Sequence, residues 1–256
     1  AAMGATTIPA ATRAATVFLT REEGKNDALA AALVSRGVRC VLRPCVATEV
    51  RPAADDDLPR ALADENGWQW LVVTSPEAAR IVAPAWAKAG RPSIDVAVVG
   101  SATGTALRKS GISPRFEPSK ATGKCLAAEL PADEAAGPGR VLYPASALAA
   151  RTVPDGLAAR GFAVERIDCY TTVDAAWSET EVEEAAGADY VAFASPSAVD
   201  SWTRRVGARA TALCIGETSG AAADAAGFPR VRFPSRPGLE AWAELIEEVL
   251  REDGRL

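Results

Sequence analysis

The sequence predicts an α/β protein of two similar domains, each built around a parallel sheet. Short apolar runs alternate with helical patterns, which is typical of parallel sheets covered by helices on both faces. Segments of the first half return in the second half after about 120 residues, a unit far longer than those of solenoid proteins. A chain of 256 residues with 48% hydrophobic residues is large enough for two cores of ordinary size.

The internal repeat consists of three pairs of segments, of which the last is the weakest. They are residues 70–78 with 190–198, 96–103 with 212–219, and 16–41 with 140–167. Two similar halves favour a ligand site between two similar domains.

The predicted strands are apolar runs, most of which end in a small or turn-forming residue. They cover residues 17–20, 38–44, 71–74, 96–100, 141–144, 164–169, 191–194 and 212–216. Helices are predicted after most of them, because apolar residues recur at helical spacing. The apolar helix faces consist of Leu29, Leu33 and Val34; of Leu126 and Leu130; and of Leu239, Trp242, Leu245 and Leu250. Residues 51–65 and 174–187 are acidic and predict solvated loops, the first leading into a short helix.

Composition excludes several kinds of catalytic site. The chain has no histidine, which removes Ser-His-Asp and Cys-His triads and histidine-bound metals. Its five cysteines form no C-x-x-C pair, so reduced and mostly buried thiols are expected rather than zinc or disulfides. The adjacent Asp55, Asp56 and Asp57 cannot all face one ion, so no metal site is predicted there.

Net charge and motif spacing argue against further classes of function. The net charge of −5 with no basic block argues against nucleic-acid binding. No apolar run approaches the roughly 20 residues that cross a bilayer. Residues 119–124 mimic part of a phosphate loop without its spacing, and residues 100–104 lack a dinucleotide fingerprint. We therefore expect no nucleotide cofactor.

Four segments place Ser or Thr between the end of a predicted strand and the start of a helix. They are residues 74–76, 100–103, 195–197 and 216–219. Ligands of such sheets bind beyond the carboxyl ends of the strands. A Ser or Thr N-cap, unpaired N–H groups and the positive end of the helix dipole would favour an anion there. Helix capping alone explains each hydroxyl taken singly. Four such segments at corresponding positions in the two halves favour a binding site.

Seven motifs occur in a recognisable order between about residue 17 and about residue 250. They are Thr20-Arg21-Glu22, Thr74-Ser75-Pro76, Val99-Gly100 with Thr103, Leu142-Tyr143-Pro144, Tyr170-Thr171-Thr172, Ser195-Pro196-Ser197-Ala198 and Ile215-Gly216-Glu217-Thr218. In this order they resemble the uroporphyrinogen-III synthase family. Residues 20–26, 118–124 and 236–240 resemble plant members in particular.

The resemblance implies two flavodoxin-like domains joined by two linker strands, with a ligand cleft between them. Domain 1 would comprise residues 1–45 and 173–256, and domain 2 residues 46–172. The Ala-rich residues 1–15 contain Arg13 and no acid, as in the remnant of a transit peptide or in a flexible end. We therefore expect a protein of the chloroplast stroma, with the cytoplasm as the alternative.

The resemblance also implies the activity: cyclisation of hydroxymethylbilane to uroporphyrinogen III, with inversion of ring D through a spiro intermediate and release of water. No cofactor or metal is implied. Tyr170 would donate a proton to the leaving hydroxyl, whereas Tyr143 and Tyr190 lie in apolar strands and are expected in the core. The predicted substrate-binding residues are Arg21, Thr74, Ser75, Gly100, Ser101, Thr103, Lys124, Ser146, Ser195, Ser197, Gly216, Thr218 and Ser219.

The expected partner is the substrate, with transient handover from the preceding pathway enzyme, and the expected state is a monomer. Two other functions fit two α/β domains. One is a two-domain protein that closes on a small molecule without catalysis. The other is a nucleotide-sugar transferase, which the missing histidine and glycine-rich fingerprint disfavour.

Overall fold

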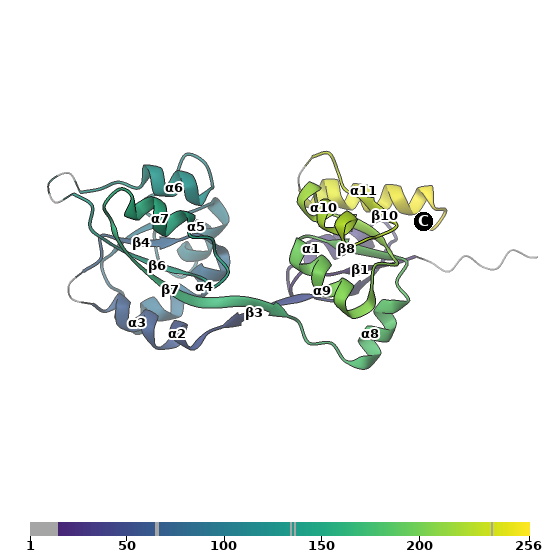
Figure 1. Cartoon of the computed structure of the whole chain (residues 1–256), viewed down its shortest axis with the longest axis horizontal. Coiled ribbons are helices and arrows are strands. Elements are labelled where there is room, and N and C mark those ends of the chain that lie inside the picture. Colours follow the sequence, from purple (N-terminus) through teal and green to yellow (C-terminus); the bar gives the residue numbers. More distant parts are fainter. Residues whose placement is uncertain (1–14, 65–66, 134, 136, 237) are drawn as a thin grey trace, which may run out of the picture. The chain divides into compact units, whose positions relative to one another are not determined.

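The computed structural model describes residues 15–64, 67–133, 135, 137–236 and 238–256. The chain divides into two compact units. Unit 1 comprises the described residues up to Ala47 together with Val173–Leu256, and unit 2 comprises Thr48–Thr172. Figure 1 shows a sheet with helices packed on both of its faces in each unit. The expected leader lies outside the described residues, apart from Ala15.

Unit 1 is built on a sheet with the strand order β10-β9-β8-β1-β2. Its strands are β1 (Thr16–Leu19), β2 (Arg39–Leu42), β8 (Tyr190–Phe193), β9 (Thr211–Cys214) and β10 (Arg230–Arg232). One face packs against α1 (Asp27–Val34) and α11 (Leu239–Glu252). The other face packs against α8 (Glu179–Ala186), α9 (Pro196–Val206) and α10 (Glu217–Ala225).

Unit 2 is built on a sheet with the order β3-β7-β6-β4-β5. Its strands are β3 (Val46–Val50), β4 (Trp70–Val73), β5 (Asp95–Val98), β6 (Arg140–Ser146) and β7 (Ala163–Asp174). One face packs against α2 (Pro52–Asp55), α3 (Asp57–Leu62), α4 (Pro76–Lys88) and α5 (Ser101–Arg108). The other face packs against α6 (Gly123–Glu129) and α7 (Thr152–Ala158).

The two sheets repeat one arrangement. The neighbours β2-β1-β8-β9 of unit 1 correspond to β7-β6-β4-β5 of unit 2. In unit 1, β10 pairs with β9 at the edge of the sheet. The counterpart in unit 2 is a single parallel bridge from Ala97 to Phe116. Numbered along the chain, the strands of unit 1 have the order 2-1-3-4-5, which is the flavodoxin-like order. The predicted α/β fold with parallel sheets is therefore confirmed.

The strands are apolar because both of their faces are buried. Along β4, Leu71 and Val73 pack against the α2–α5 side, while Trp70 and Val72 pack against α6 and α7. A strand covered on both faces cannot alternate polar with apolar residues, so it appears in the sequence as a continuous apolar run.

Several predicted elements are wrong in extent. The run predicted over 38–44 forms a strand only at Arg39–Leu42, and β3 and β10 were not predicted. Residues 51–65, expected to be largely loop, hold α2 and α3, because Leu58 and Leu62 are spaced to bury one helix face in the core. Residues 174–187 hold α8, which begins with a capping box at Ser178. Val34, predicted on the buried face of α1, is 61% exposed.

Close packing of α7 on α6 at Gly156 gives a testable prediction. A Cβ atom at Gly156 would lie 2.7 Å from Ala127 Cβ, and neither helix has a flexible side chain there that could move aside. Alanine is the better helix former by about 1 kcal/mol, but overpacking costs about 1–3 kcal/mol. We expect Gly156→Ala to lower the free energy of unfolding measured in urea.

Gly104→Ala on α5 is the matched control for that measurement. Its Cβ would meet only the end of the Arg108 side chain, at 3.1 Å, and this end can move. The free energy of unfolding should therefore stay unchanged or rise with the gain in helix propensity. Equal effects of the two substitutions would contradict the close approach of α6 and α7.

Candidate functional site

The strand order creates one special position in each sheet. Connections leave neighbouring strands in opposite directions at β1 and β8 in unit 1, and at β6 and β4 in unit 2. In open α/β sheets the carboxyl ends of such a pair form a crevice in which ligands bind. In unit 2 this position is lined by Thr74 and Ser75 after β4 and by Ser146 at the end of β6.

Ser75 caps α4. Its Oγ accepts a hydrogen bond of 2.9 Å from the Ala78 N–H, and Pro76 occupies the first helical position, where no N–H is needed. Ser195 caps α9 in the same way in unit 1, through a 3.3 Å bond from the Ala198 N–H. The predicted serine N-cap is confirmed in these two segments.

Tyr170 joins Ser75 at this position. The two hydroxyl oxygens lie 2.7 Å apart. The pairing of β6 with β7 shifts register here, because Ala145 pairs with Asp168 and Ser146 with Tyr170. Cys169 is therefore an extra residue, and such bulges change the direction of a side chain.

The bulge puts Tyr170 on the face of the sheet that Ser75 occupies. Ile167, Cys169 and Tyr170 all pack in the same core cluster, whereas strict alternation would send Tyr170 to the opposite face. The sequence predicted a strand that ends before Tyr170; instead this residue lies within β7, which continues to Asp174.

Tyr170 is a weak acid that is largely shielded from solvent. The residue is only 8% exposed, and burial raises its pKa above the ordinary value of a phenol, while the bond with Ser75 partly offsets that rise. The phenol is therefore protonated at neutral pH.

The other two tyrosines are buried, as predicted. Tyr143 lies 3.3 Å from Thr74 Oγ1 through its hydroxyl oxygen. Tyr190 donates a 2.9 Å hydrogen bond to Asp253, and burial first, then this bond, raise its pKa to about 12.

The two segments that begin with glycine, residues 100–103 and 216–219, differ from the prediction. Gly100 and Gly216, rather than Ser or Thr, are the N-caps of α5 and α10, so the predicted hydroxyl caps are wrong there. Gly100 has φ +83°, a conformation that favours glycine. Thr103 is 2% exposed and donates to the Val99 carbonyl at 2.8 Å, which makes its hydroxyl structural.

The remaining predicted residues have different surroundings. Ser219 is buried at 3%, while Ser101, Lys124 and Thr218 are exposed. Ser197 is exposed, and its Oγ lies 3.0 Å from Ser195 Oγ. Arg21 is half-buried in the loop after β1.

Two polar side chains that shape these loops were missed. The buried amide of Asn26 donates to the carbonyls of Leu19 at 3.4 Å and Arg21 at 2.8 Å and so holds the loop after β1. Arg166 holds the loop after β6 in a comparable way. The only sequence signal for the role of Arg166 is that it is a charged residue inside a predicted strand. Asn26 looks like an ordinary residue at the start of a helix, so its contacts with the loop could not be predicted.

Metal ligands and cysteine thiols are the other groups in this chain that could support chemistry. The part of the chain that the structure describes holds no group of three or more Cys, Asp or Glu that could bind a metal ion, and no helix long and apolar enough to cross a membrane. The cysteines are free, and burial raises the pKa of Cys45, Cys169 and Cys214 to about 12. Buried protonated thiols are poor nucleophiles.

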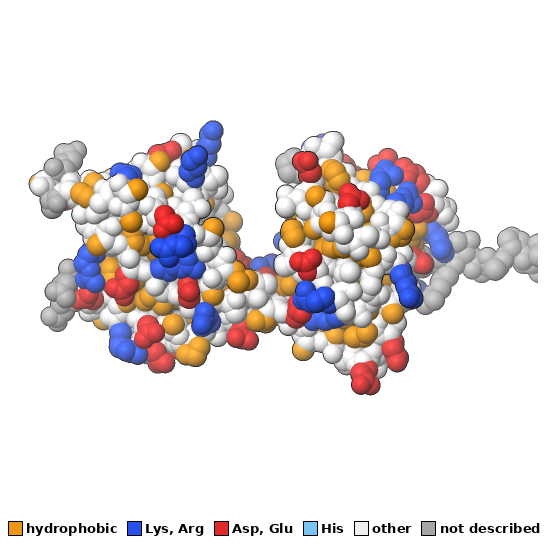
Figure 2. Space-filling model, in the orientation of Figure 1, with side chains coloured by type: hydrophobic (Ala, Val, Ile, Leu, Met, Phe, Trp, Pro, Cys, Tyr) orange, Lys and Arg blue, Asp and Glu red, His pale blue; other side chains and the backbone are white. Residues whose placement is uncertain are grey.

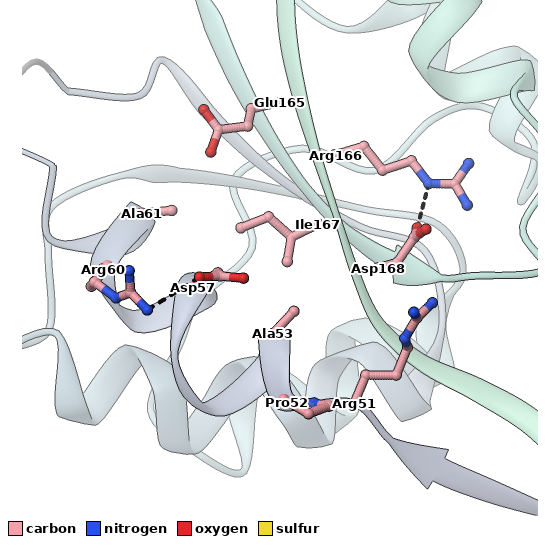
Figure 3. Close-up of a pocket in the computed structure, with 10 residues that line it drawn as sticks. All are labelled: Arg51, Pro52, Ala53, Asp57, Arg60, Ala61, Glu165, Arg166, Ile167 and Asp168. Carbon is pink, nitrogen blue, oxygen red and sulfur yellow. Dashed lines mark hydrogen bonds and ion pairs between the residues drawn. The ribbon is translucent and has the colours of Figure 1, made fainter.

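A pocket of about 670 Å³ in unit 2 contains none of the predicted site residues. Figure 3 shows it between α2, α3 and β7, with the ion pairs of Arg60 with Asp57 and of Arg166 with Asp168. Three arginines and three carboxylates line it, so its charges balance. In Figure 2 basic and acidic side chains are likewise interspersed on the visible face of each unit.

Comparison with known proteins identifies the family. Residues 27–244 match the family model described as "Uroporphyrinogen-III synthase HemD". The chain belongs to the uroporphyrinogen-III synthase family. It is 39% identical over 250 residues to the chloroplastic uroporphyrinogen-III synthase of Oryza sativa subsp. japonica, covering 93% of this chain and 82% of the rice protein. The family predicted from the sequence motifs is confirmed.

Two solved uroporphyrinogen-III synthases share the fold. A mutant of the enzyme from the extremely thermophilic bacterium Thermus thermophilus has 21% identity and a TM-score of 0.60, covering 93% of this chain and 100% of that chain. The enzyme from Helicobacter pylori 26695 has 15% identity and a TM-score of 0.62, covering 92% and 99%. At these identities the two comparisons show a shared fold.

The internal repeat of this family member supplies a controlled test of the contact between Ser75 and Tyr170. Ser75→Ala removes a helix cap, which costs about 0.5–2 kcal/mol, and leaves the buried Tyr170 hydroxyl without its partner, at about 1–3 kcal/mol. Ser195→Ala removes the same cap from α9, where the second contact of the hydroxyl is the exposed Ser197 Oγ at 3.0 Å rather than a buried tyrosine. We expect urea unfolding to show a larger loss for Ser75→Ala. Equal losses would mean that the contact contributes nothing.

Proposed function

We propose that this chain is a uroporphyrinogen-III synthase that closes hydroxymethylbilane into uroporphyrinogen III without a cofactor. The observation that carries the proposal is the hydrogen bond between Tyr170 and Ser75, at the strand-end position where ligands of this fold bind, in a member of the synthase family. It supplies a protonated acid next to helix-capping groups suited to carboxylates.

The reaction requires one proton at its start and releases one at its end. The hydroxymethyl oxygen of the linear tetrapyrrole takes up a proton and leaves as water, as the C–O bond breaks. The substituted carbon of ring D attacks the resulting azafulvene cation and forms a spiro pyrrolenine. This intermediate reopens and recloses with ring D inverted, and loss of a proton restores the aromatic pyrrole.

Tyr170 is the proposed donor of the first proton. Ser75 Oγ already accepts from the Ala78 N–H, so its own hydroxyl proton is available to the Tyr170 oxygen. In that arrangement the phenolic proton is free to reach the leaving hydroxyl, and the Ser75 bond stabilises the phenolate that forms. General acid catalysis of this kind contributes about 10²–10⁴-fold.

Substrate carboxylates are proposed to bind at the strand ends of each unit. The first turns of α4 and α9 offer N–H groups and a favourable helix dipole, and the exposed hydroxyls of Ser101, Ser197 and Thr218 can donate as well. These contacts act locally, so an overall charge of −5 does not prevent a polyanionic substrate from binding. Thr103 supports this region through the backbone rather than through the ligand.

The proposal extends to the setting of the enzyme. The rice relative is named chloroplastic, which supports a plastid location and a role in chlorophyll and haem synthesis for this chain. We propose that it works as a monomer and receives its unstable substrate from the enzyme that makes it.

Product analysis tests the function. The purified protein, dialysed against a chelator, is incubated with hydroxymethylbilane, and the oxidised products are separated by chromatography. We expect mainly the type III isomer, against the type I isomer that forms without enzyme. Type I product alone, or activity that returns only on addition of a metal or nucleotide, would contradict the proposal.

Tyr170→Phe tests the proton donor. Phenylalanine keeps the ring in the core and removes only the hydroxyl, so the loss should appear in kcat, by about 10²–10⁴-fold, with the product still type III. Tyr143→Phe is the control. It also removes a phenol hydroxyl, but from the neighbouring strand β6, where that hydroxyl lies 3.3 Å from Thr74 Oγ1. A folded Tyr170→Phe variant with normal kcat would remove Tyr170 from the mechanism.

A further inference from the structure

Arg166 binds the backbone of the β6–α7 loop, defined here as Ser146–Ala149. Its guanidinium donates to the Ser146 carbonyl at 2.9 Å, the Ala149 carbonyl at 3.0 Å and the Ala147 carbonyl at 3.3 Å. Its Nε donates to Asp168 at 2.7 Å, which fixes the plane of the fork (Figure 3). One side chain thus satisfies three carbonyl groups of one short loop.

The surroundings make this contact strong. The Arg166 side chain is only 18% exposed, and its hydrogen bonds are charge-assisted. The loop is tied from a second direction as well, because the Ala147 N–H donates to the Tyr170 carbonyl at 2.7 Å. The β6–α7 loop is therefore joined to the same stretch of β7 that carries the proposed acid.

The loop presents two different groups. Ser146 Oγ accepts from the Leu148 N–H at 3.2 Å, which leaves its hydroxyl proton for a ligand. Leu148 is 70% exposed as a residue, although its side chain is large and apolar. A hydroxyl donor beside an apolar surface suits a ligand that combines carboxylates with flat rings, and the loop lies at the strand-end position shared with Thr74 and Ser75.

We propose that Arg166 is a positioning residue for substrate binding. It holds the β6–α7 loop in its binding conformation, so that Ser146 meets a substrate carboxylate and Leu148 packs on a pyrrole ring. This inference rests on the proposed synthase function. Without the Arg166 guanidinium, the loop has to be ordered each time substrate binds. Substrate binding is then weaker, whereas the rate of the chemical step is unchanged.

Arg166→Lys is the variant that separates charge from geometry. Lysine keeps a cation beside Asp168, but a compact ammonium cannot bridge three carbonyls as the planar fork does. With hydroxymethylbilane as substrate we expect KM to rise about tenfold while kcat stays within about twofold, as for a misplaced binding group. The product should remain type III, because Tyr170 and the rest of the site are unchanged.

Arg160→Lys is the matched control. Arg160 binds the carbonyls of Ala127 at 2.7 Å and Leu130 at 2.8 Å at the end of α6, with the same chemistry but in no contact with a strand-end loop. Its variant should leave both KM and kcat unchanged. An equal rise in KM for both variants would show a general loss of structure and overturn the proposal, as would an unchanged KM in Arg166→Lys.

Ser146→Ala keeps the proposal testable if Arg166→Lys does not fold. Ser146→Ala should raise KM by itself. If Arg166→Lys does fold, the increases in KM from the two substitutions should be less than additive in the double variant, because both act through one loop. Full additivity, or a normal KM in Ser146→Ala, would contradict the role of the loop. A wild-type protein that makes no type III product would overturn the proposed function. If the wild type makes type III product and the variants have an unchanged KM, this inference alone would be overturned.

Discussion

Parallel pairing within each sheet is the constraint on which the rest of this structure depends. Because β6, β4 and β5 run in the same direction as the first part of β7, their carboxyl ends lie along one edge of the unit 2 sheet. Side chains from distant parts of the sequence then meet there: Ser75, which follows β4, and Tyr170 in β7 are 95 residues apart and share a hydrogen bond. Helices packed on both faces leave the strand ends as the natural place for a ligand.

Hydroxyl groups in this protein divide into two kinds that a sequence motif does not distinguish. Thr20 and Thr103 donate to backbone carbonyls and are buried, so they stabilise the ends of strands. Ser101 and Thr218 are exposed in the first turns of their helices. Ser75 combines both roles, because it caps α4 and contacts Tyr170. Within residues 100–103, one hydroxyl therefore supports the fold, at Thr103, and another faces solvent, at Ser101.

An acidic chain acting on a substrate with many carboxylates needs local rather than global electrostatics. Helix N-termini supply partial positive charge without adding a cation. Among the described residues, Arg166 and Arg43 are largely buried and paired with carboxylates, so they serve the protein's own structure first. Fixed dipoles need no reorganisation on binding, which suits a reaction whose outcome depends on the geometry of one ring.

The sequence by itself determined the fold class, the repeat, the family and the identity of the strand-end segments. These features depend on local patterns: continuous apolar runs in doubly covered strands, and Ser-Pro steps that end strands and begin helices. Only the tertiary structure decided which residues meet. The extra residue Cys169 turns Tyr170 toward Ser75, and Arg166 reaches a loop about 20 residues away along the chain, because register and side-chain direction depend on pairing between strands rather than on the residues of either strand alone.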